Sequence, residues 1–363
     1  MAGSSRASVV ANAGPATVLG QRAAEVAAVL GTDHVFFRSG SRWRAATVAL
    51  RGVAARRPRL VYAVDISVFT VVVALFAAAL GARIVFDTGD DIAAIRAKTG
   101  RMPSLNRRLG SVLEGLALSC AASVIVRSEG LRDRLAHKTG RTVTVIPDGF
   151  DRGAATRADR HSARRRWGVG DGTLTVGVLG SANWHPRLEW CYGCDVIEVV
   201  SRVSRSDVVG ILLVKGNGLP HLRALAVARG VMDRLIFEEP ADGQDVYEQL
   251  YGLDVGLSTQ TNDRVGQART TGKLVQYLAA DVYVLASRVG DAALLLPAEQ
   301  CVEYRGAWDP LFFERLACQV DALPERARVK AAAHAVAERV APRFEYSSLR
   351  TKWQQALADS TSA

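Results

Sequence analysis

The sequence predicts an α/β protein with two doubly wound, Rossmann-like domains. Apolar strands and helical stretches alternate almost throughout the 363 residues, which is typical of parallel sheets covered by helices on both faces. The length exceeds that of a single compact core and fits two domains of ordinary size. With 49% hydrophobic and 23% charged residues, the composition excludes a disordered or fibrous chain.

The first half carries six apolar segments that predict strands. They cover residues 7–11, 34–38, 60–64, 83–87, 123–127 and 142–147. Helices are expected between them, beginning near Gly20, Ser41, Ile66, Ser104 and Glu129. The apolar run 66–80 is shorter than the ~18 residues that a bilayer span requires. It therefore predicts a buried crossover helix.

The polar segment 151–167 contains six arginines and marks the expected domain junction. A second sheet is expected after it, with strands at residues 173–179, 209–214, 235–237, 255–258 and 282–286. A helix over 344–357 comes last. The predicted division is a first domain over 1–151, a second over 152–343, and a final helix and tail over 344–363.

The formal net charge of +10 is unevenly distributed. Residues 34–64 contain seven arginines and no Asp or Glu, and apolar residues such as Trp43 are interleaved with them. Such a basic helix suits an anionic membrane surface, and it equally suits a solvated protein face. No recognition motif or zinc spacing supports binding to nucleic acid. Because residues 1–15 show no secretory signal, we expect a cytoplasmic protein. If the basic helix does bind a membrane, the expected contact is peripheral and at its inner face.

The five cysteines are scattered and odd in number, so reduced thiols are expected rather than a disulfide framework. Cys191 and Cys194 form W-C-Y-G-C with Trp190, which resembles the redox motif of thioredoxin-like proteins. The long loop before Cys191 and the lack of partner residues favour two small residues on a helix instead.

The most informative stretch is T-T-G-K at residues 270–273, where a polar loop opens a short helix. A helix start gathers unpaired N–H groups and the positive end of the dipole, so it can hold a phosphate. The alternative is an ordinary βα crossover with no ligand. Two other strand-end loops accompany it, L-G-S-A-N-W at 179–184 and K-G-N-G at 215–218. Tandem doubly wound domains would place such loops at a cleft between the domains.

A series of motifs resembles the family-4 glycosyltransferases, retaining enzymes of GT-B fold that transfer a sugar from a nucleotide donor. The motifs are V-I-P-D-G-F-D at 145–151, L-L-V-K-G-N-G at 212–218, D-R-L-I-F at 233–237, L-D-V-G-L-S at 253–258, K-L-V-Q-Y-L-A-A-D-V-Y-V-L-A-S at 273–287 and F-E-Y at 344–346. Their order and spacing cover nearly the whole chain. The resemblance implies a hexosyltransferase-type enzyme with a C-terminal helix that returns to the first domain.

The resemblance also implies roles for individual residues. The loop 270–273 holds the donor diphosphate, Gln276 stands where the family has a ribose-binding glutamate, and Gly20 leaves room for the donor. Asp90 and Asp91 lie where many members carry a histidine near the reacting sugar, and they are the candidate catalytic residues. The residues expected to bind the donor are Gly20, Gly180, Ser181, Arg187, Lys215, Gly216, Gly218, Thr270, Thr271, Gly272, Lys273 and Gln276.

The predicted chemistry is electrostatic. Fixed donors aimed at the leaving diphosphate lower the barrier, and in retaining members that phosphate accepts the proton of the acceptor. Amides and Lys273 make a metal unnecessary, and no cofactor is expected beyond the nucleotide-sugar substrate. The expected acceptor is a sugar, a lipid-linked glycan or a small molecule. For a bacterial-type enzyme this means a cell-envelope glycan, a glycolipid or a secondary metabolite.

Two departures from the family pattern leave an alternative function open. The E-x7-E pattern lacks its glutamates, with Ala268 at the first position and Gln276 at the second, and D-T-G-D-D at 87–91 replaces the histidine after the fourth strand. A catalytically silent GT-B homologue that partners another protein is therefore the alternative. A Rossmann-type oxidoreductase is weaker still, because neither half shows G-x-G-x-x-G after its first strand.

Overall fold

The computed structural model describes residues 7–38, 40–99, 102–140, 142–243 and 245–362. Residues 1–6 belong to the stretch 1–15 that is predicted to carry no secretory signal, and they lie outside the described residues. The chain divides into two compact units. Unit 1 comprises the chain up to Gly149, the short segment Ala268–Thr270 and the chain from Tyr346 onward, and unit 2 comprises Phe150–Gln267 and Thr271–Glu345.

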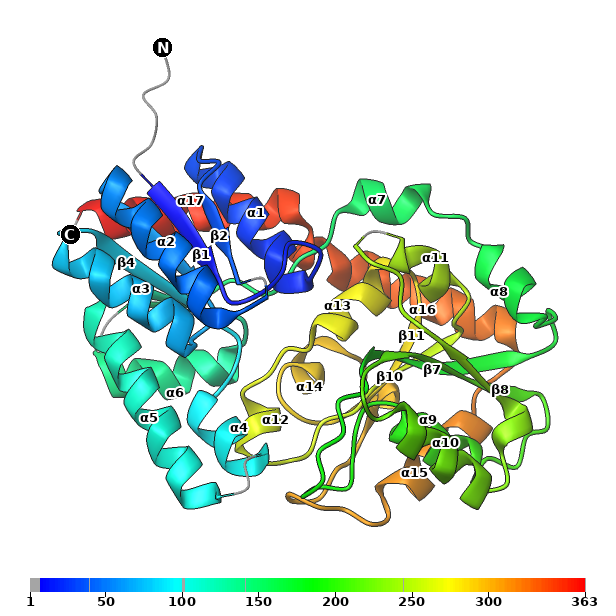
Figure 1. The fold of residues 1–363 in the computed structure, drawn as a ribbon. Helices are drawn as coiled ribbons and strands as arrows, with labels where there is room; N and C mark the ends of the chain where they lie inside the picture. Colours follow the sequence, from blue (N-terminus) through cyan, green and yellow to red (C-terminus); the bar gives the residue numbers. More distant parts are fainter. Residues whose placement is uncertain (1–6, 39, 100–101, 141, 244, 363) are drawn as a thin grey trace. The chain divides into compact units, whose positions relative to one another are not determined.

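Unit 1 contains a parallel sheet of six strands in the order β2-β1-β3-β4-β5-β6 (Figure 1). The strands are β1 Ala7–Ala11, β2 Val35–Phe37, β3 Leu60–Val64, β4 Arg83–Thr88, β5 Ala121–Val126 and β6 Val143–Val145. Most of their residues are buried, as expected for a sheet covered on both faces. The strand order reverses its direction between β1 and β3.

Helices cover both faces of this sheet. They are α1 Val18–Leu30, α2 Arg42–Arg56, α3 Val68–Ala79, α4 Ile92–Thr99, α5 Pro103–Cys120, α6 Glu129–Thr139 and α17 Tyr346–Ser362. Core residues of α2, α3, α5 and α6 gather on one face, and those of α1 and α17 gather on the other. Local caps fix the starts of these helices, because Thr17, Ser67 and Ser128 each accept a backbone N–H of the first turn.

The C-terminal helix α17 is anchored to unit 1 by a buried polar cluster. Arg22 of α1 donates to Asp87 of β4 over 2.6 Å and to the carbonyls of Ile146 and Pro147. Tyr62 donates to the same carboxylate over 2.5 Å and accepts from the indole N–H of Trp353 on α17. The predicted return of the last helix to the first domain is therefore confirmed, and α17 lies beside α1 (Figure 1).

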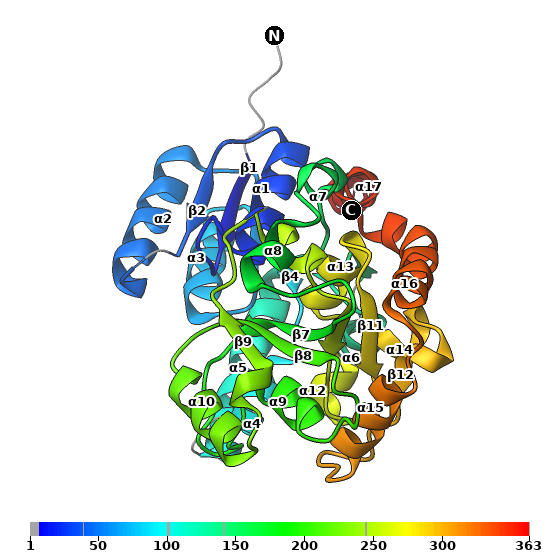
Figure 2. The same ribbon diagram turned by 90° about the vertical axis from the view of Figure 1, so that its right-hand side faces the viewer.

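Unit 2 contains a second parallel six-stranded sheet in the order β12-β11-β10-β7-β8-β9 (Figure 2). The strands are β7 Leu174–Ser181, β8 Val208–Lys215, β9 Leu235–Glu238, β10 Val255–Ser258, β11 Tyr283–Ser287 and β12 Cys301–Val302. The order reverses between β7 and β10. Ligands of open parallel sheets bind outside the carboxyl ends of the strands at such a switch point.

The helices of unit 2 also form two layers. They are α7 Arg152–Arg157, α8 Ser162–Trp167, α9 Cys194–Val200, α10 Leu219–Ala228, α11 Val246–Tyr251, α12 Arg264–Gln267, α13 Gly272–Ala279, α14 Ala292–Leu295, α15 Phe312–Asp321 and α16 Arg326–Val340, with 3-10 turns at Met232–Arg234, Ala298–Gln300 and Ala341–Phe344. One core layer includes α9, α10 and α15, and the other includes α11 and α13.

The amino end of the second sheet holds a buried ionic cluster. Asp254, which precedes β10 and has no exposed surface, accepts from Arg164 over 2.9 Å and from Arg326 over 2.8 Å. It also accepts from the amide of Thr175, and the ammonium of Lys330 lies 3.6 Å away. Burial opposes ionisation, but Lys330, the Thr175 amide and the two arginines together hold the pKa of Asp254 below its ordinary value.

The sequence predictions differ from the structure in a few elements. Neither α4 nor the two-residue strand β12 was expected, and the segment 151–167 carries two short helices. The run 66–80 does form the crossover helix α3, but only one side of it is buried. None of the described helices combines the length and the apolar composition needed to cross a membrane.

We expect Trp353→Ala to destabilise the protein by about 3 to 5 kcal/mol, because it removes a fully buried indole and the donor to Tyr62. Thermal unfolding measures this as a lower melting temperature. The matched control is Trp308→Ala, since Trp308 is 67% exposed and its removal should change the stability by less than about 0.5 kcal/mol. Equal melting temperatures for the two variants would contradict the anchoring role.

The Asp254 cluster predicts acid sensitivity. Because the pKa of Asp254 is lower in the folded state than in the unfolded chain, its stabilisation is complete above the ordinary value near ~4 and is lost as the pH falls through that range. Asp254→Asn should lower the stability at pH 7 by about 3 to 5 kcal/mol, since it leaves buried cations without their anion. Urea unfolding between pH 3 and 7 should show a flatter pH dependence in the variant, and an unchanged slope would refute the assignment.

Candidate functional site

The helix α13 begins at the switch point of the second sheet. Its N-cap residue is Thr271, whose hydroxyl lies 3.0 Å from the hydroxyl of Ser258, the last residue of β10. On the next turn, the hydroxyl of Tyr277 accepts from the backbone N–H of Leu179 in β7 over 2.8 Å. Burial raises the pKa of Tyr277, so its hydroxyl stays neutral. These contacts fix the amino end of α13 against both strands that flank the switch point.

Two of the predicted loops meet at this end of the helix. The ammonium of Lys273, in the first turn of α13, lies 3.2 Å from the centre of the Tyr192 ring. A Cβ added to Gly180 in β7 would lie 2.9 Å from the same ring, so the aromatic side chain packs directly on the glycine. Lys273 is only 7% exposed. Tyr192 therefore joins Gly180 and Lys273, and a desolvated contact of this type contributes about 2 kcal/mol.

Tyr192 is a site residue that the sequence reasoning missed. It stands inside W-C-Y-G-C, whose cysteines are both buried and free, with Cys194 opening α9. The following Gly193 has φ 109°. Its amide donates to the fully buried carboxylate of Asp195, which also accepts from the hydroxyl of Thr259 after β10. The motif thus fixes the turn that positions Tyr192. This supports a structural role for the two cysteines rather than a redox role.

The loop 215–218 packs against the loop that follows β7. Lys215 is exposed, and its ammonium pairs with Glu239, which raises the pKa of the lysine. Gly218 donates its N–H to the carbonyl of Ala182 over 2.7 Å, and Gly216 has φ 152°. A Cβ on either glycine would lie within 2.6 Å of that carbonyl oxygen. The two glycines therefore allow this loop to pack on the loop that follows β7.

The other unit 2 residues predicted to bind the donor occupy less enclosed positions. Ser181 and Arg187 are exposed, and Arg187 lies in a turn closed by the His185–Trp190 bridge. Gln276 is partly exposed one turn after Lys273, and Thr271 and Gly272 are also partly exposed at the helix start. The structure thus brings Gly180 close to Lys273 through Tyr192, with Thr271 and Gly272 beside the lysine in the chain.

The predicted residues of unit 1 have mostly structural contacts. A Cβ on Gly20 would lie 2.2 Å from the carbonyl oxygen of Gly14, so this glycine allows the preceding loop to close. Asp91 is 1% exposed, accepts from the amide of Ala94 and pairs with Arg134, so it caps α4. Asp90 is more accessible than Asp91, with 29% of its side chain exposed.

The segment that precedes Thr271 packs with unit 1. Arg269 pairs with Asp90 over 2.5 Å, and the hydroxyl of Ser128 donates to the carbonyl of Ala268. Thr270, which is predicted to bind the nucleotide-sugar donor, belongs to the same segment and is 8% exposed. The predicted loop 270–273 is therefore divided in the chain, with Thr270 in unit 1 and residues 271–273 in unit 2. The predicted cleft between the domains stays a prediction.

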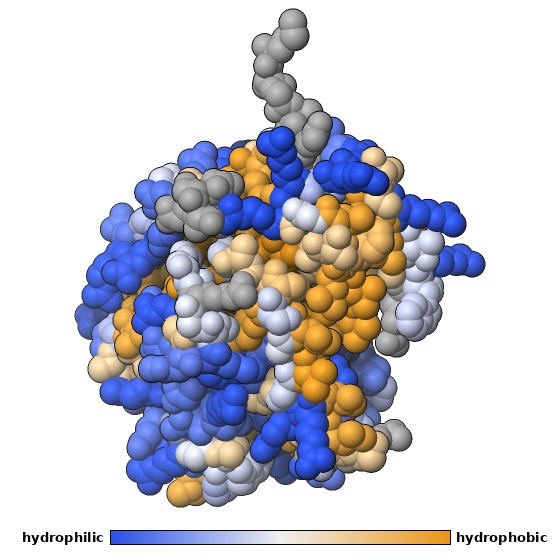
Figure 3. Space-filling view, turned by 90° about the vertical axis from the view of Figure 1, so that its left-hand side faces the viewer, coloured by the Kyte–Doolittle hydropathy of each residue, from blue (hydrophilic) through white to orange (hydrophobic). Residues whose placement is uncertain are grey.

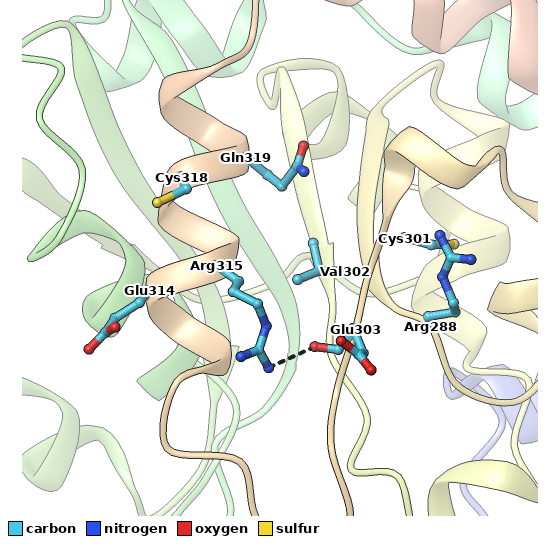
Figure 4. A pocket seen from close by; sticks show the side chains of 8 residues that line it. All are labelled: Arg288, Cys301, Val302, Glu303, Glu314, Arg315, Cys318 and Gln319. Atoms are coloured by element: carbon cyan, nitrogen blue, oxygen red, sulfur yellow. Dashed lines mark hydrogen bonds between the residues drawn. The ribbon is translucent and has the colours of Figure 1, made fainter.

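A separate hollow lies beside the edge strand β12, and it contains none of the predicted site residues. Figure 4 shows its lining from β12, α15 and adjoining residues: Arg288, Cys301, Val302, Glu303, Glu314, Arg315, Cys318 and Gln319. Arg315 donates to the carbonyl of Glu303 over 3.0 Å and also pairs with Asp309. Its cation is thus already neutralised by protein. Within the described residues, no group of three His, Cys, Asp or Glu side chains is placed to hold a metal ion.

Comparison with known proteins agrees with the resemblance inferred from the motifs. No family model matches the chain. The D-inositol 3-phosphate glycosyltransferase of Stackebrandtia nassauensis is 28% identical over 207 residues, which are 53% of this chain and 44% of that protein. The match therefore spans less than half of the curated relative.

Solved structures match almost the whole chain. The Anabaena protein Alr3699/HepE in complex with UDP and glucose superposes with a TM-score of 0.74 at 17% identity, covering 97% of this chain and 99% of that one. Sucrose-phosphate synthase of Thermosynechococcus elongatus gives a TM-score of 0.75 at 14% identity, covering 97% and 98%. The chain has the GT-B fold, as predicted. The curated relative is a glycosyltransferase, which agrees with the resemblance to family-4 glycosyltransferases.

Proposed function

We propose that the protein is a retaining glycosyltransferase that binds a nucleotide-diphosphate sugar at the amino end of α13. The observation that supports this most directly is the packing of Lys273, Tyr192 and Gly180 beside the switch point of the second sheet. The Anabaena protein of the same fold has been solved with UDP-glucose. UDP-glucose is therefore the first donor to test.

The proposed donor site acts on the diphosphate. The N–H groups of the first turn of α13 and the helix dipole favour an anion there, and Lys273 adds a full positive charge. Tyr192 holds the ammonium before the donor arrives, so little reorganisation is needed on binding. Gly180 permits this packing because any larger residue would displace the ring.

Bond cleavage places positive charge on the anomeric carbon and negative charge on the departing diphosphate. The amino end of α13 and Lys273 stabilise that negative charge, by ~2 to 4 kcal/mol for each well-placed donor. In a retaining transfer the phosphate then takes the proton of the acceptor hydroxyl. Such a mechanism needs neither a metal ion nor a carboxylate pair.

We assign roles in this site to four more of the predicted residues. Gln276 bonds the ribose as a neutral amide, while Gly216 and Gly218 support the β7 loop. Of the two predicted carboxylates, we assign the role near the reacting sugar to Asp90, because 29% of its side chain is exposed whereas Asp91 is buried at the start of α4. We further infer that the enzyme acts in the cytoplasm and contacts an anionic membrane peripherally. Its acceptor is a glycan, a glycolipid or a small metabolite.

Lys273→Ala should weaken UDP-glucose binding by about tenfold to a hundredfold, which corresponds to a lost charge-assisted hydrogen bond of about 1.5 to 3 kcal/mol. Isothermal titration calorimetry measures the affinity, and thermal unfolding checks the fold. Lys352→Ala serves as the control, because that lysine lies exposed on α17 in unit 1. An affinity that Lys273→Ala leaves unchanged would remove the main site assignment.

If the first enzyme assay with UDP-glucose is negative, a thermal-shift series with UDP-, GDP- and dTDP-sugars identifies the donor, because a ligand of the native state raises the melting temperature.

Gln276→Glu distinguishes the enzyme from a catalytically silent homologue. A carboxylate accepts the ribose hydroxyls more strongly than an amide does, so the variant should bind the donor several-fold more tightly and turn it over faster. Release of UDP from UDP-glucose provides the readout. Gln319→Glu is the control, because Gln319 lies at the separate hollow beside β12. If neither the wild-type protein nor the variant binds any nucleotide, the silent alternative is correct.

A further inference from the structure

One surface of unit 1 is apolar beyond what its core requires. The helix α3 contains no charged residue, and its exposed side chains Val68, Val72 and Phe76, followed by Leu80, recur every four residues. Between 36% and 49% of each is exposed. The opposite side of α3 already packs on the sheet through residues such as Phe69 and Val73. The stripe is therefore not needed to close the core.

The neighbouring helix α5 carries a second stripe. Leu105, Leu109, Val112 and Leu116 are spaced by four, three and four residues, which places them on one side of a helix. Each is between 44% and 60% exposed. Since α3 and α5 pack against each other, the two stripes lie on neighbouring helices. We call these eight residues the apolar face, and Figure 3 shows a band of apolar side chains bordered by hydrophilic ones on this side of the molecule.

The charge around the apolar face is positive. The helix α2 packs on the other side of α3 and exposes Arg44, Arg51 and Arg56 together with Trp43. On α5, Arg107 and Arg108 are exposed beside the leucine stripe. The only acidic residue of the three helices is Glu114, which is 1% exposed and neutralised by Arg134 and Lys138. The three helices therefore present apolar and cationic groups and no exposed carboxylate.

We propose that the apolar face docks the protein on an anionic lipid bilayer. The apolar stripes would enter the boundary between headgroups and acyl chains, and the arginines would contact the lipid phosphates. A second copy of the chain fits less well, because a symmetric contact would bring the arginines of both copies together. Nucleic acid would leave the apolar stripes exposed to water. The proposal rests on the membrane contact inferred above and names the surface that makes it.

The test is cosedimentation of the full chain with phosphatidylcholine vesicles, with or without phosphatidylglycerol. We expect binding to the anionic vesicles, weaker binding at high salt and little binding to the neutral ones. Val72→Glu/Leu109→Glu should reduce binding at least tenfold. Arg51→Glu/Arg108→Glu should abolish the preference for anionic lipid. Val227→Glu/Leu294→Glu is the matched control, since these unit 2 side chains are 66% and 71% exposed.

Thermal unfolding and UDP-glucose affinity of each variant verify that the fold and the donor site are intact. No nucleotide is present in the vesicle assay, so a negative result there leaves the proposed transfer reaction unaffected. Absence of wild-type binding to anionic vesicles, or equal binding by Val72→Glu/Leu109→Glu, overturns the proposal. A wild-type dimer in light scattering that becomes a monomer in this variant would show instead that a second copy covers the face.

Discussion

The buried contact between Arg22 and Asp87 is the interaction on which unit 1 depends most. Removing a guanidinium and a carboxylate from water is costly, and the cost is offset only when the remaining hydrogen-bonding groups are satisfied. Here the guanidinium also donates to two carbonyls after β6, and the carboxylate also accepts from Tyr62. The stacking of Arg22 on Trp353, whose N–H reaches Tyr62, extends the same cluster to α17. This one ion pair thus connects α1 with β3, β4, the residues after β6 and the helix α17.

The two ends of the second sheet carry different charged groups. At the amino end, Asp254 gathers arginines and a lysine, and its charge is balanced within the protein. At the carboxyl end, Lys273 lies on an aromatic ring beside a helix start, where the positive potential suits an incoming anion. The cluster at the amino end thus contributes to acid stability, and the carboxyl end is where we propose that the donor binds.

Most of the fold was predictable because buried parallel strands are nearly continuous apolar runs. The strand Val255–Ser258 was predicted at its observed bounds, whereas β12 was missed because two residues carry no periodicity and form a strand only by pairing with β11. The helix start at Lys273 was predictable from local sequence. Tyr192 was not, since its role arises from a contact between segments that lie some eighty residues apart. Asp91 shows the converse, because an acidic residue after a strand can be a helix cap as readily as a catalytic group.

The position of α17 in the chain has a consequence for biosynthesis. Every other element of unit 1 and the whole of unit 2 are synthesised before Trp353. Until then one side of the first sheet lacks the indole that covers Arg22 and Tyr62, so nascent unit 1 exposes apolar surface. Packing on this side of the first sheet is thus completed only after unit 2 has been synthesised.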